Sequence, residues 1–375
     1  MRSNSYGFRY PIDPDIPKPR GVLRIFVLGG SAAYGIYLQE NETIAGFLES
    51  YLRHIFDRVE VINVGVPGYR TAQELQMLVF RVLAFDPDIV IFFDGYNDLV
   101  PAIQEGVTLT PFGWEDDMVE QTRLRQKLAA ESPYRYLLSE SLDRSGIVRT
   151  IHHALKKAGK SETGTETGTW REPPPEAIRN YKRTLQSMIT TARGHGIGAI
   201  AAFQPNFYFG NHKLSHSEKG VLSTDMRTRP QRVAHTARAT PFYRYAAQDA
   251  AKVAGGRFVD LSDVFIDATA RNFIDYVHLS PYANLIIARR LLSEIESILF
   301  ERNLVNGGDA KEIRAAFEEV RRMIQDRLIH HTDGPTPAME DDTRLATKGI
   351  RFGIVAAPSA SLKVIPHGSS LENLR

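Results

Sequence analysis

"RIFVLGGSAAYG" (residues 24–35) runs from a short apolar stretch into two glycines, a serine and then small residues. The apolar residues predict a buried β-strand, and the serine after the glycines predicts the start of a helix. A turn of this kind is either an ordinary capped turn or a place where a phosphate or a nucleophile sits at a helix N-terminus. Taken alone, the turn favours capping over catalysis.

Four further apolar, β-branched runs follow, and helical patterns lie between them. The five predicted strands cover residues 23–29, 59–65, 88–95, 196–205 and 257–265, and the predicted helices cover 42–56, 71–85, 175–193, 242–253 and 281–302. Nearly continuous apolar strands that alternate with helices are typical of a parallel sheet covered on both faces. We therefore predict an α/β fold, a three-layer α/β/α sandwich with a five-stranded, mainly parallel sheet.

The composition is that of a soluble globular protein, and the length allows one large domain with insertions or two ordinary domains. The chain has 375 residues, of which 43% are hydrophobic and 24% charged, and its 46 basic residues nearly balance its 44 acidic ones. The net charge of +2 gives no reason to expect a nucleic-acid partner. Because there is no cysteine, disulfides, thiolate metal sites and cysteine nucleophiles are excluded.

Two segments interrupt the alternation of strands and helices, and two flank it. We expect an extended arm over residues 1–20, a single domain over 21–305, and a C-terminal appendage over 306–375. Inside the domain, residues 101–170 form a long insertion and 206–241 a second, polar one, each either a lid or a surface ornament. We expect an amphipathic helix over residues 309–331, which either packs on the body or mediates a dimer. The stretch "IRFGIVAA" (350–357) could add a strand.

Targeting signals are missing from the sequence. No stretch has the roughly 18 consecutive apolar residues of a membrane span, and the first 20 residues have no apolar core typical of a signal peptide. We expect no integral membrane segment. The protein is cytoplasmic if the chain is complete, and exported or membrane-anchored if an upstream segment has been trimmed.

Three glycine-containing turns follow the first three predicted strands, so they share one edge of the sheet. The turn at Ser31 is not a phosphate loop, a dinucleotide fingerprint or a G-x-S-x-G elbow, since no lysine follows and Ala33 replaces the last glycine. In "NVGVPGYRT" (63–71), Gly68 can bring its N–H close to a ligand. In "DGYND" (94–98), Asn97 could donate its amide to an oxyanion, and we interpret Asp94 and Asp98 as turn and cap residues.

A serine nucleophile needs a base, and His278 is the strongest of the eleven histidines. Asp275 precedes it by three residues, close enough to hold the imidazole tautomer whose Nε2 accepts a proton. Ser280 and Pro281 mark the start of the next helix. The other histidines that we compared with it are interpreted as solvated surface residues, and none shows metal-ligand spacing: His152, His153, His212, His216, His235, His330 and His331.

Together the four blocks resemble the GDSL or SGNH hydrolases. "LGGSAAYG" is similar to their serine block, "NVGVPGYRT" to the glycine block, "DGYND" to the Gly-x-Asn-Asp block, and "DYVH" (275–278) to the Asp-x-x-His block. The blocks span residues 28–278 and occur in the family's order. Gly30 departs from the pattern, because it stands where the family has the aspartate of its name. "RSNSYGFR" (2–9) also resembles, more weakly, the lead-in of bacterial members that act on exported glycans.

The resemblance implies a flavodoxin-like hydrolase fold and a serine-dependent carboxylester hydrolase, esterase or deacetylase, that works through an acyl-enzyme. It implies Ser31 as the nucleophile, His278 as the base and Asp275 as its orienting acid. It also implies an oxyanion hole from the N–H groups of Ser31 and Gly68 with the Asn97 amide. No metal or organic cofactor is expected.

Two other functions remain open. An acyltransferase could use the same serine and pass the acyl group to a glycan, and a binding or assembly protein could keep the fold without activity. The expected partner is a small-molecule or glycan ester, with a homo-oligomer through the C-terminal helix as a further option. Five aromatic residues in the insertions suit stacking on a sugar, an acyl channel or plain packing: Phe112, Trp114, Phe207, Tyr208 and Phe209.

Overall fold

The computed structural model describes residues 3–106, 170–268, 270–306, 310–329 and 352–354. Its centre is a five-stranded parallel sheet with the order β2-β1-β3-β4-β5. The strands are β1 (Leu23–Gly29), β2 (Val59–Asn63), β3 (Ile89–Asp94), β4 (Gly198–Phe203) and β5 (Arg257–Asp260). The predicted α/β class, strand number and parallel direction are confirmed, and the order is that of flavodoxin-like folds.

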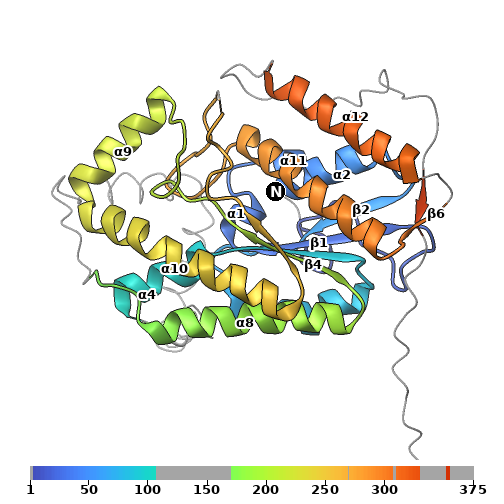
Figure 1. The fold of residues 1–375 in the computed structure, drawn as a ribbon, viewed down its shortest axis with the longest axis horizontal. Coiled ribbons are helices and arrows are strands. Elements are labelled where there is room, and N and C mark those ends of the chain that lie inside the picture. Colours follow the sequence, from blue (N-terminus) through green and yellow to red (C-terminus); the bar gives the residue numbers. More distant parts are fainter. Residues whose placement is uncertain (1–2, 107–169, 269, 307–309, 330–351, 355–375) are drawn as a thin grey trace, which may run out of the picture.

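Helices cover both faces of the sheet because successive strand residues face opposite sides. Ile25 and Val27 of β1 belong to one apolar cluster, with α2 (Ile44–Leu52) and α11 (Pro281–Glu301). Phe26 and Leu28 belong to the other, with α3 (Thr71–Phe80), α8 (Pro175–Gly194) and α10 (Pro230–Ala254). Figure 1 shows α2 and α11 on one side of the strands and α8 on the other.

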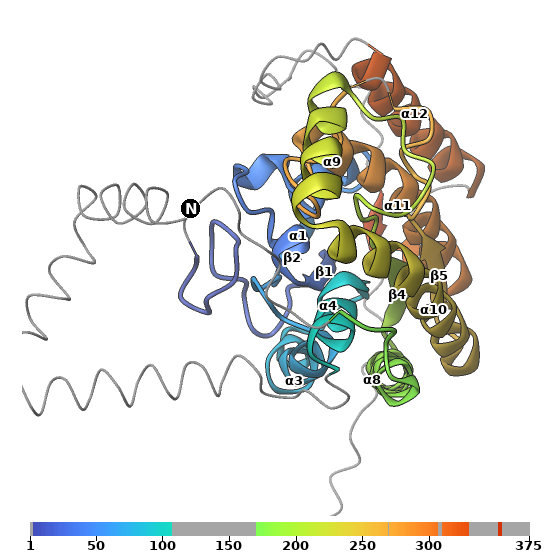
Figure 2. The same cartoon turned by 90° about the vertical axis from the view of Figure 1, so that its left-hand side faces the viewer.

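The carboxyl ends of the strands meet at one edge of the sheet. The short helix α1 (Ser31–Tyr34) follows β1, and α4 (Tyr96–Glu105) follows β3. Helix α9 (His216–Thr228) lies at the same end of the molecule, and Figure 2 is turned so that this end faces the viewer. Two short 3₁₀ turns lie in the connections: η1 (Glu40–Glu42) between α1 and α2, and η2 (Val82–Phe85) between α3 and β3.

Several predicted boundaries were wrong. Strands β2, β3, β4 and β5 are shorter than predicted, and β5 shows the largest difference because it ends at Asp260, five residues before the predicted end. The helix predicted from residue 242 begins at Pro230, twelve residues earlier. The first half of this helix is polar and contains Pro241, which lacks the helical N–H donor. For this reason the spacing of apolar residues predicted a helix only after Pro241. Pro230 stands at the first helical position, where a missing N–H costs nothing.

Both ends of the described chain contact the α/β body. Phe8 and Tyr10 of the N-terminal arm are buried in the second cluster, and the Arg9 N–H donates to the Asn63 carbonyl at 2.9 Å. Helix α12 (Ala310–Ile329) turns its apolar side into the first cluster through buried residues such as Phe317 and Ile324. Strands β6 (Val305–Asn306) and β7 (Gly353–Ile354) form an antiparallel pair. Within the described residues, no helix is long and apolar enough to cross a membrane.

Candidate active site

The turn after β1 places Ser31 at the first position of α1. Gly29 has a φ of 154°, and a Cβ there would lie 2.6 Å from the Ala33 Cβ and 2.7 Å from the Phe93 carbonyl oxygen. Such contacts are closer than real Cβ atoms make, so the chain needs glycine to leave the strand at this angle. Because Ser31 opens the helix, its own N–H has no partner in the preceding turn and faces outward at the positive end of the helix.

Ser31 lies beside His278, although 247 residues separate them in the chain. The serine Oγ is 2.9 Å from His278 Nε2, and His278 Nδ1 is 2.6 Å from Asp275 Oδ2. The three side chains thus form one continuous hydrogen-bonded chain. With the Nδ1 proton donated to the carboxylate, Nε2 is left as an acceptor for the serine proton.

Asp275 is held in place by its own loop. Its second oxygen accepts the N–H groups of Val277 and His278, at 2.9 and 2.8 Å. Burial would raise the pKa of Asp275, but the hydrogen bonds from the His278 side chain and from these two N–H groups outweigh it and lower the pKa. The carboxyl group of Asp275 is therefore ionised at neutral pH and can accept a proton donated by His278 Nδ1.

The second turn brings Gly68 to the same edge. The Tyr69 N–H donates to the Val66 carbonyl at 3.0 Å, which closes a four-residue turn around Pro67 and Gly68. Gly68 has a φ of 84°, the left-handed conformation that the third residue of a type II turn adopts, and proline is common at the second position of such turns. The hydrogen bond that closes the turn is donated by the N–H of Tyr69 and does not involve the N–H of Gly68.

The third turn brings Asn97 against the other two. Its side-chain Nδ2 donates to the Tyr69 carbonyl at 2.8 Å, which ties α4 to the turn that carries Gly68. An amide nitrogen has two protons, so this bond leaves one donor for another acceptor. Asp98, the next residue, accepts the N–H and the hydroxyl of Thr71 at 3.1 and 2.8 Å. The side chains of Asn97 and Asp98 therefore both connect the start of α4 to the segment that contains Gly68 and Thr71.

Sequence comparison agrees with this arrangement. The model of the GDSL-like Lipase/Acylhydrolase family matches residues 27–284, more than half of the chain and a range that includes all four blocks. The chain belongs to the GDSL-like lipase/acylhydrolase family. It is accordingly a hydrolase of carboxylic esters, and the resemblance seen in the four blocks is confirmed.

Solved structures with a similar arrangement include two acetylxylan esterases. One is a catalytic mutant of Axe2 from Geobacillus stearothermophilus, 14% identical, with 75% of this chain and 95% of that chain covered and a TM-score of 0.41. The other is the acetyl xylan esterase AlAXEase, 14% identical, with 72% of this chain and 99% of that chain covered and a TM-score of 0.41. No curated protein shows significant sequence similarity to the chain.

Two buried charged residues outside the four sequence blocks support this GDSL-type site. Glu218 of α9 is 1% exposed, and its Oε1 accepts the N–H groups of Asn272 and Phe273 at 2.9 and 2.8 Å. These residues begin the loop that carries Asp275 and His278. The second insertion thus contributes a contact that fixes the loop. The only sequence signal was the pairing of Ser215 with Glu218 as a capping box.

The second buried residue is Arg9 of the N-terminal arm, which is 3% exposed. Its guanidinium donates to the carbonyls of Tyr34, Gly35 and Leu38, the last two at 2.7 and 2.6 Å. These carbonyls belong to the segment that follows Ser31. A residue of the N-terminal arm therefore holds the backbone that follows Ser31, and the only sequence signal was that Arg9 ends the stretch "RSNSYGFR" (2–9).

The remaining residues proposed from the sequence are not part of the hydrogen-bonded chain of Ser31, His278 and Asp275. Phe207 and Tyr208 are buried in the core, and Phe209 is half-buried, so Phe207 and Tyr208 serve packing. Phe112 and Trp114, like His152, His153, His330 and His331, lie outside the described residues. His212 Nε2 donates to the Asn206 carbonyl at 3.0 Å, and burial lowers the pKa of His212. Among the described residues no group of three or more histidine and acidic side chains could hold a metal ion.

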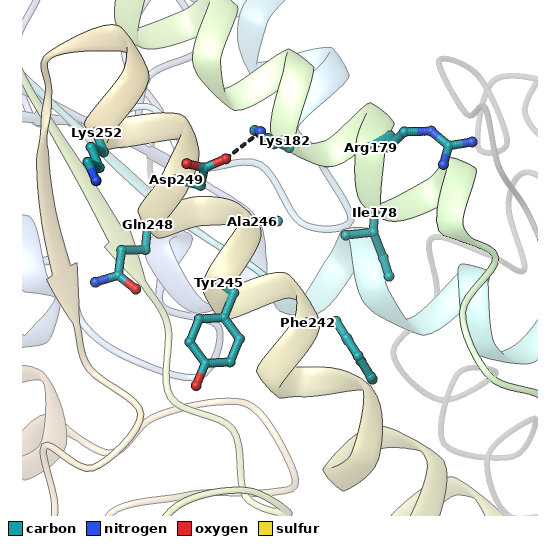
Figure 3. Close-up of a pocket in the computed structure, with 9 residues that line it drawn as sticks. All are labelled: Ile178, Arg179, Lys182, Phe242, Tyr245, Ala246, Gln248, Asp249 and Lys252. Carbon is teal, nitrogen blue, oxygen red and sulfur yellow. Dashed lines mark ion pairs between the residues drawn. The ribbon is translucent and has the colours of Figure 1, made fainter.

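A separate groove lies between α8 and α10, which pack in the second apolar cluster, and none of Ser31, Asp275 and His278 lines it. Its volume is about 610 Å³, and Figure 3 shows Phe242 and Tyr245 of α10 opposite Ile178 of α8, with an ion pair between Lys182 and Asp249. The groove contains neither a serine nor a histidine. It therefore offers no counterpart to the pair of Ser31 and His278 at the edge of the sheet.

Proposed function

We propose that the protein hydrolyses a carboxylic ester through a covalent acyl-enzyme on Ser31. The observation that supports this most directly is the hydrogen-bonded chain from Ser31 Oγ through His278 to Asp275, with distances of 2.9 and 2.6 Å. In this proposal His278 is the general base and Asp275 holds its tautomer. The catalytic domain is residues 21–305.

The oxyanion of the tetrahedral intermediate is stabilised by three N–H donors. They are the backbone N–H groups of Ser31 and Gly68 and the remaining amide proton of Asn97. This assignment is supported by the position of Ser31 at a helix start, by the left-handed φ of Gly68, and by the bond that orients Asn97. Preorganised donors of this kind stabilise charge that develops only in the transition state.

The reaction has two halves. Ser31 Oγ attacks the ester carbonyl while His278 Nε2 takes its proton, and the tetrahedral intermediate then collapses as Nε2 returns that proton to the leaving alcohol. In the second half a water molecule attacks the acyl-serine, His278 takes the water proton, and the acid leaves as Ser31 is reprotonated. Neither half needs a metal ion or an organic cofactor.

A fluorophosphonate probe and an activated acetyl ester test the assignment. The wild-type chain should be labelled at Ser31, and Ser31→Ala should lose the label and at least about a thousandfold in turnover. Ser187→Ala is the matched control, because Ser187 lies on α8 and donates to the Arg183 carbonyl at 2.9 Å. Labelling that persists in Ser31→Ala, or wild-type turnover in that variant, would show that another residue is the nucleophile.

A further inference from the structure

Tyr37, three residues after the end of α1, is unusual in both its backbone and its exposure. Its φ is 72°, a left-handed conformation that a bulky aromatic residue rarely adopts, and its side chain is 67% exposed. Strained backbone of this kind persists where the surroundings enforce it, and it concentrates at functional sites. An exposed ring contributes little packing, so the fold gains little from having tyrosine at this position.

The segment around Tyr37 is held rigidly. Arg9 donates to the carbonyls of Gly35 and Leu38 on either side of it, at 2.7 and 2.6 Å. The Leu38 N–H also donates to the Gly35 carbonyl at 3.1 Å, and the Leu38 side chain is buried. The exposed ring of Tyr37 therefore projects from a loop whose two ends are fixed.

The ring lies beside the catalytic histidine. The centroids of the Tyr37 and His278 rings are 5.8 Å apart, with an interplanar angle of 89°. In the proposed mechanism His278 gives its proton to the leaving alcohol, so the alcohol part of the ester has to lie on the His278 side of Ser31. The acyl oxygen lies instead toward Gly68 and Asn97. Tyr37 is thus placed to contact the alcohol and not the acyl chain.

We infer that Tyr37 is a specificity-determining residue that stacks on a pyranose ring, so that the substrate is an ester of a sugar hydroxyl. This inference rests on the proposed function. A pyranose has an apolar C–H face that matches a flat aromatic ring, and hydroxyl groups at its edge that match the phenol oxygen. An exposed tyrosine beside His278 provides both the aromatic face and the phenol oxygen. Because its loop is already fixed, binding should cost little conformational entropy.

The test compares three acetyl esters that share an acyl group and differ in the alcohol: an acetylated cello-oligosaccharide, triacetin and ethyl acetate. Tyr37→Asn removes the ring and keeps a residue that tolerates the left-handed backbone. We expect it to raise KM for the oligosaccharide about tenfold with kcat little changed, and to leave kcat/KM for ethyl acetate within about twofold. Tyr37→Phe should retain most of the oligosaccharide activity.

Binding provides a second readout that does not depend on turnover. In the Ser31→Ala background, Tyr37→Asn should weaken the Kd for the acetylated oligosaccharide about tenfold. Tyr245→Ala is the control, since Tyr245 is also exposed but lies in the groove on α10. Tyr37→Asn should melt no lower than the wild type, because it relieves backbone strain.

Four results would overturn the inference. An equal loss on all three esters would indicate a structural role, a loss confined to triacetin would indicate a glyceride alcohol, and no loss on any ester would show that the ring does not touch substrate. A wild-type chain that hydrolyses ethyl acetate but neither hydrolyses nor binds the oligosaccharide would also exclude it. Failure of the proposed function looks different, because the wild type would then hydrolyse none of the esters in a Ser31-dependent way.

Discussion

The side-chain amide of Asn97 occupies the space that a Cβ on Gly30 would need. A Cβ built on Gly30 falls on the Asn97 Nδ2 atom, far inside van der Waals contact, and 3.3 Å from the Tyr69 carbonyl oxygen that this nitrogen binds. Gly30 is the position at which the chain departs from the sequence that names its family. In this protein the missing side chain has a structural consequence, because the amide of the Asn block lies directly against the backbone before the nucleophile.

Adding a side chain at residue 30 should therefore disturb the oxyanion site. We expect Gly30→Ala to lower kcat by about 10²–10³ with little change in KM, because it displaces a donor that acts mainly in the transition state. Gly220→Ala on α9 is the control, since its added Cβ would meet nothing within 4 Å. Steady-state kinetics on a short acetyl ester make the comparison, and a fully active Gly30→Ala enzyme would contradict the assigned role of Asn97.

Removing the amide tests the same donor directly. Asn97→Ala should lower kcat by about 10²–10³ per folded molecule and leave KM for short esters nearly unchanged. If Asn97 only closes a turn, the effect should instead be a loss of stability of up to about 2 kcal/mol with normal turnover. In a double-mutant cycle, Gly30→Ala should add little to Asn97→Ala, because both remove one interaction. Additive losses would show that the two changes act separately.

Gly68 is constrained by its backbone as well as by its role as a donor. Because its φ is 84°, any L-residue there is strained, and we expect Gly68→Ala to cost roughly 1–3 kcal/mol of stability. Gly68→Val should be worse in both stability and turnover, since a branched side chain pushes the N–H further out of line. Chemical denaturation and kcat measured on the same preparations separate the two effects. Equal turnover for Ala, Val and wild type would remove Gly68 from the oxyanion hole.

Glu218 should control the catalytic loop from a distance. Glu218→Ala leaves the buried N–H groups of Asn272 and Phe273 without their acceptor, which should cost about 1–3 kcal/mol and lower kcat by misplacing His278. Glu218→Gln keeps one carbonyl oxygen and should be milder in both respects. A solely structural role would lower stability while the pH profile of kcat/KM stayed that of the wild type. We expect that profile to shift in Glu218→Ala, because the Asp275–His278 geometry changes.

The buried carboxyl groups behind the Asn97 turn predict a pH-dependent stability. Burial raises the pKa of Asp94 to about 7, with nearby Asp98 adding to the effect, and burial together with Asp94 raises the pKa of Glu74 well above its usual value. A raised pKa means that the folded state binds more protons than the unfolded one. This contribution to stability is present below about pH 4, and it is lost as the pH rises through about 7.

Denaturant titrations between pH 5 and 9 measure this effect. We expect the wild-type free energy of unfolding to fall across the window, and Asp94→Asn, which cannot ionise, to flatten that fall. Asp249→Asn is the control, because Asp249 lies exposed on α10 and forms an ion pair with Lys182 of α8. An Asp94→Asn variant with the wild-type pH dependence would show that this carboxyl is not the titrating group.

The sheet and the four blocks could be predicted because their signals are local. A run such as residues 23–29 is apolar throughout, and Ser31, Gly68 and Asn97 each follow a strand end, so the parallel topology alone brings them to one edge. The contacts of Arg9 and Glu218 could not be predicted, since each depends on tertiary neighbours far along the chain. The φ of Tyr37 was likewise hidden, because nothing in "GIYLQ" (35–39) favours a left-handed tyrosine.

The long sequence separation of Ser31 and His278 also bears on when the enzyme becomes reactive during synthesis. In the proposed mechanism the proton acceptor of Ser31 is His278, which lies 247 residues further along the chain and reaches Ser31 only after all five strands have been made. Until then the serine hydroxyl is an ordinary alcohol at the end of one strand. A nascent chain arrested before residue 278 should therefore resist a fluorophosphonate, and labelling should appear only in chains long enough to fold the last loop.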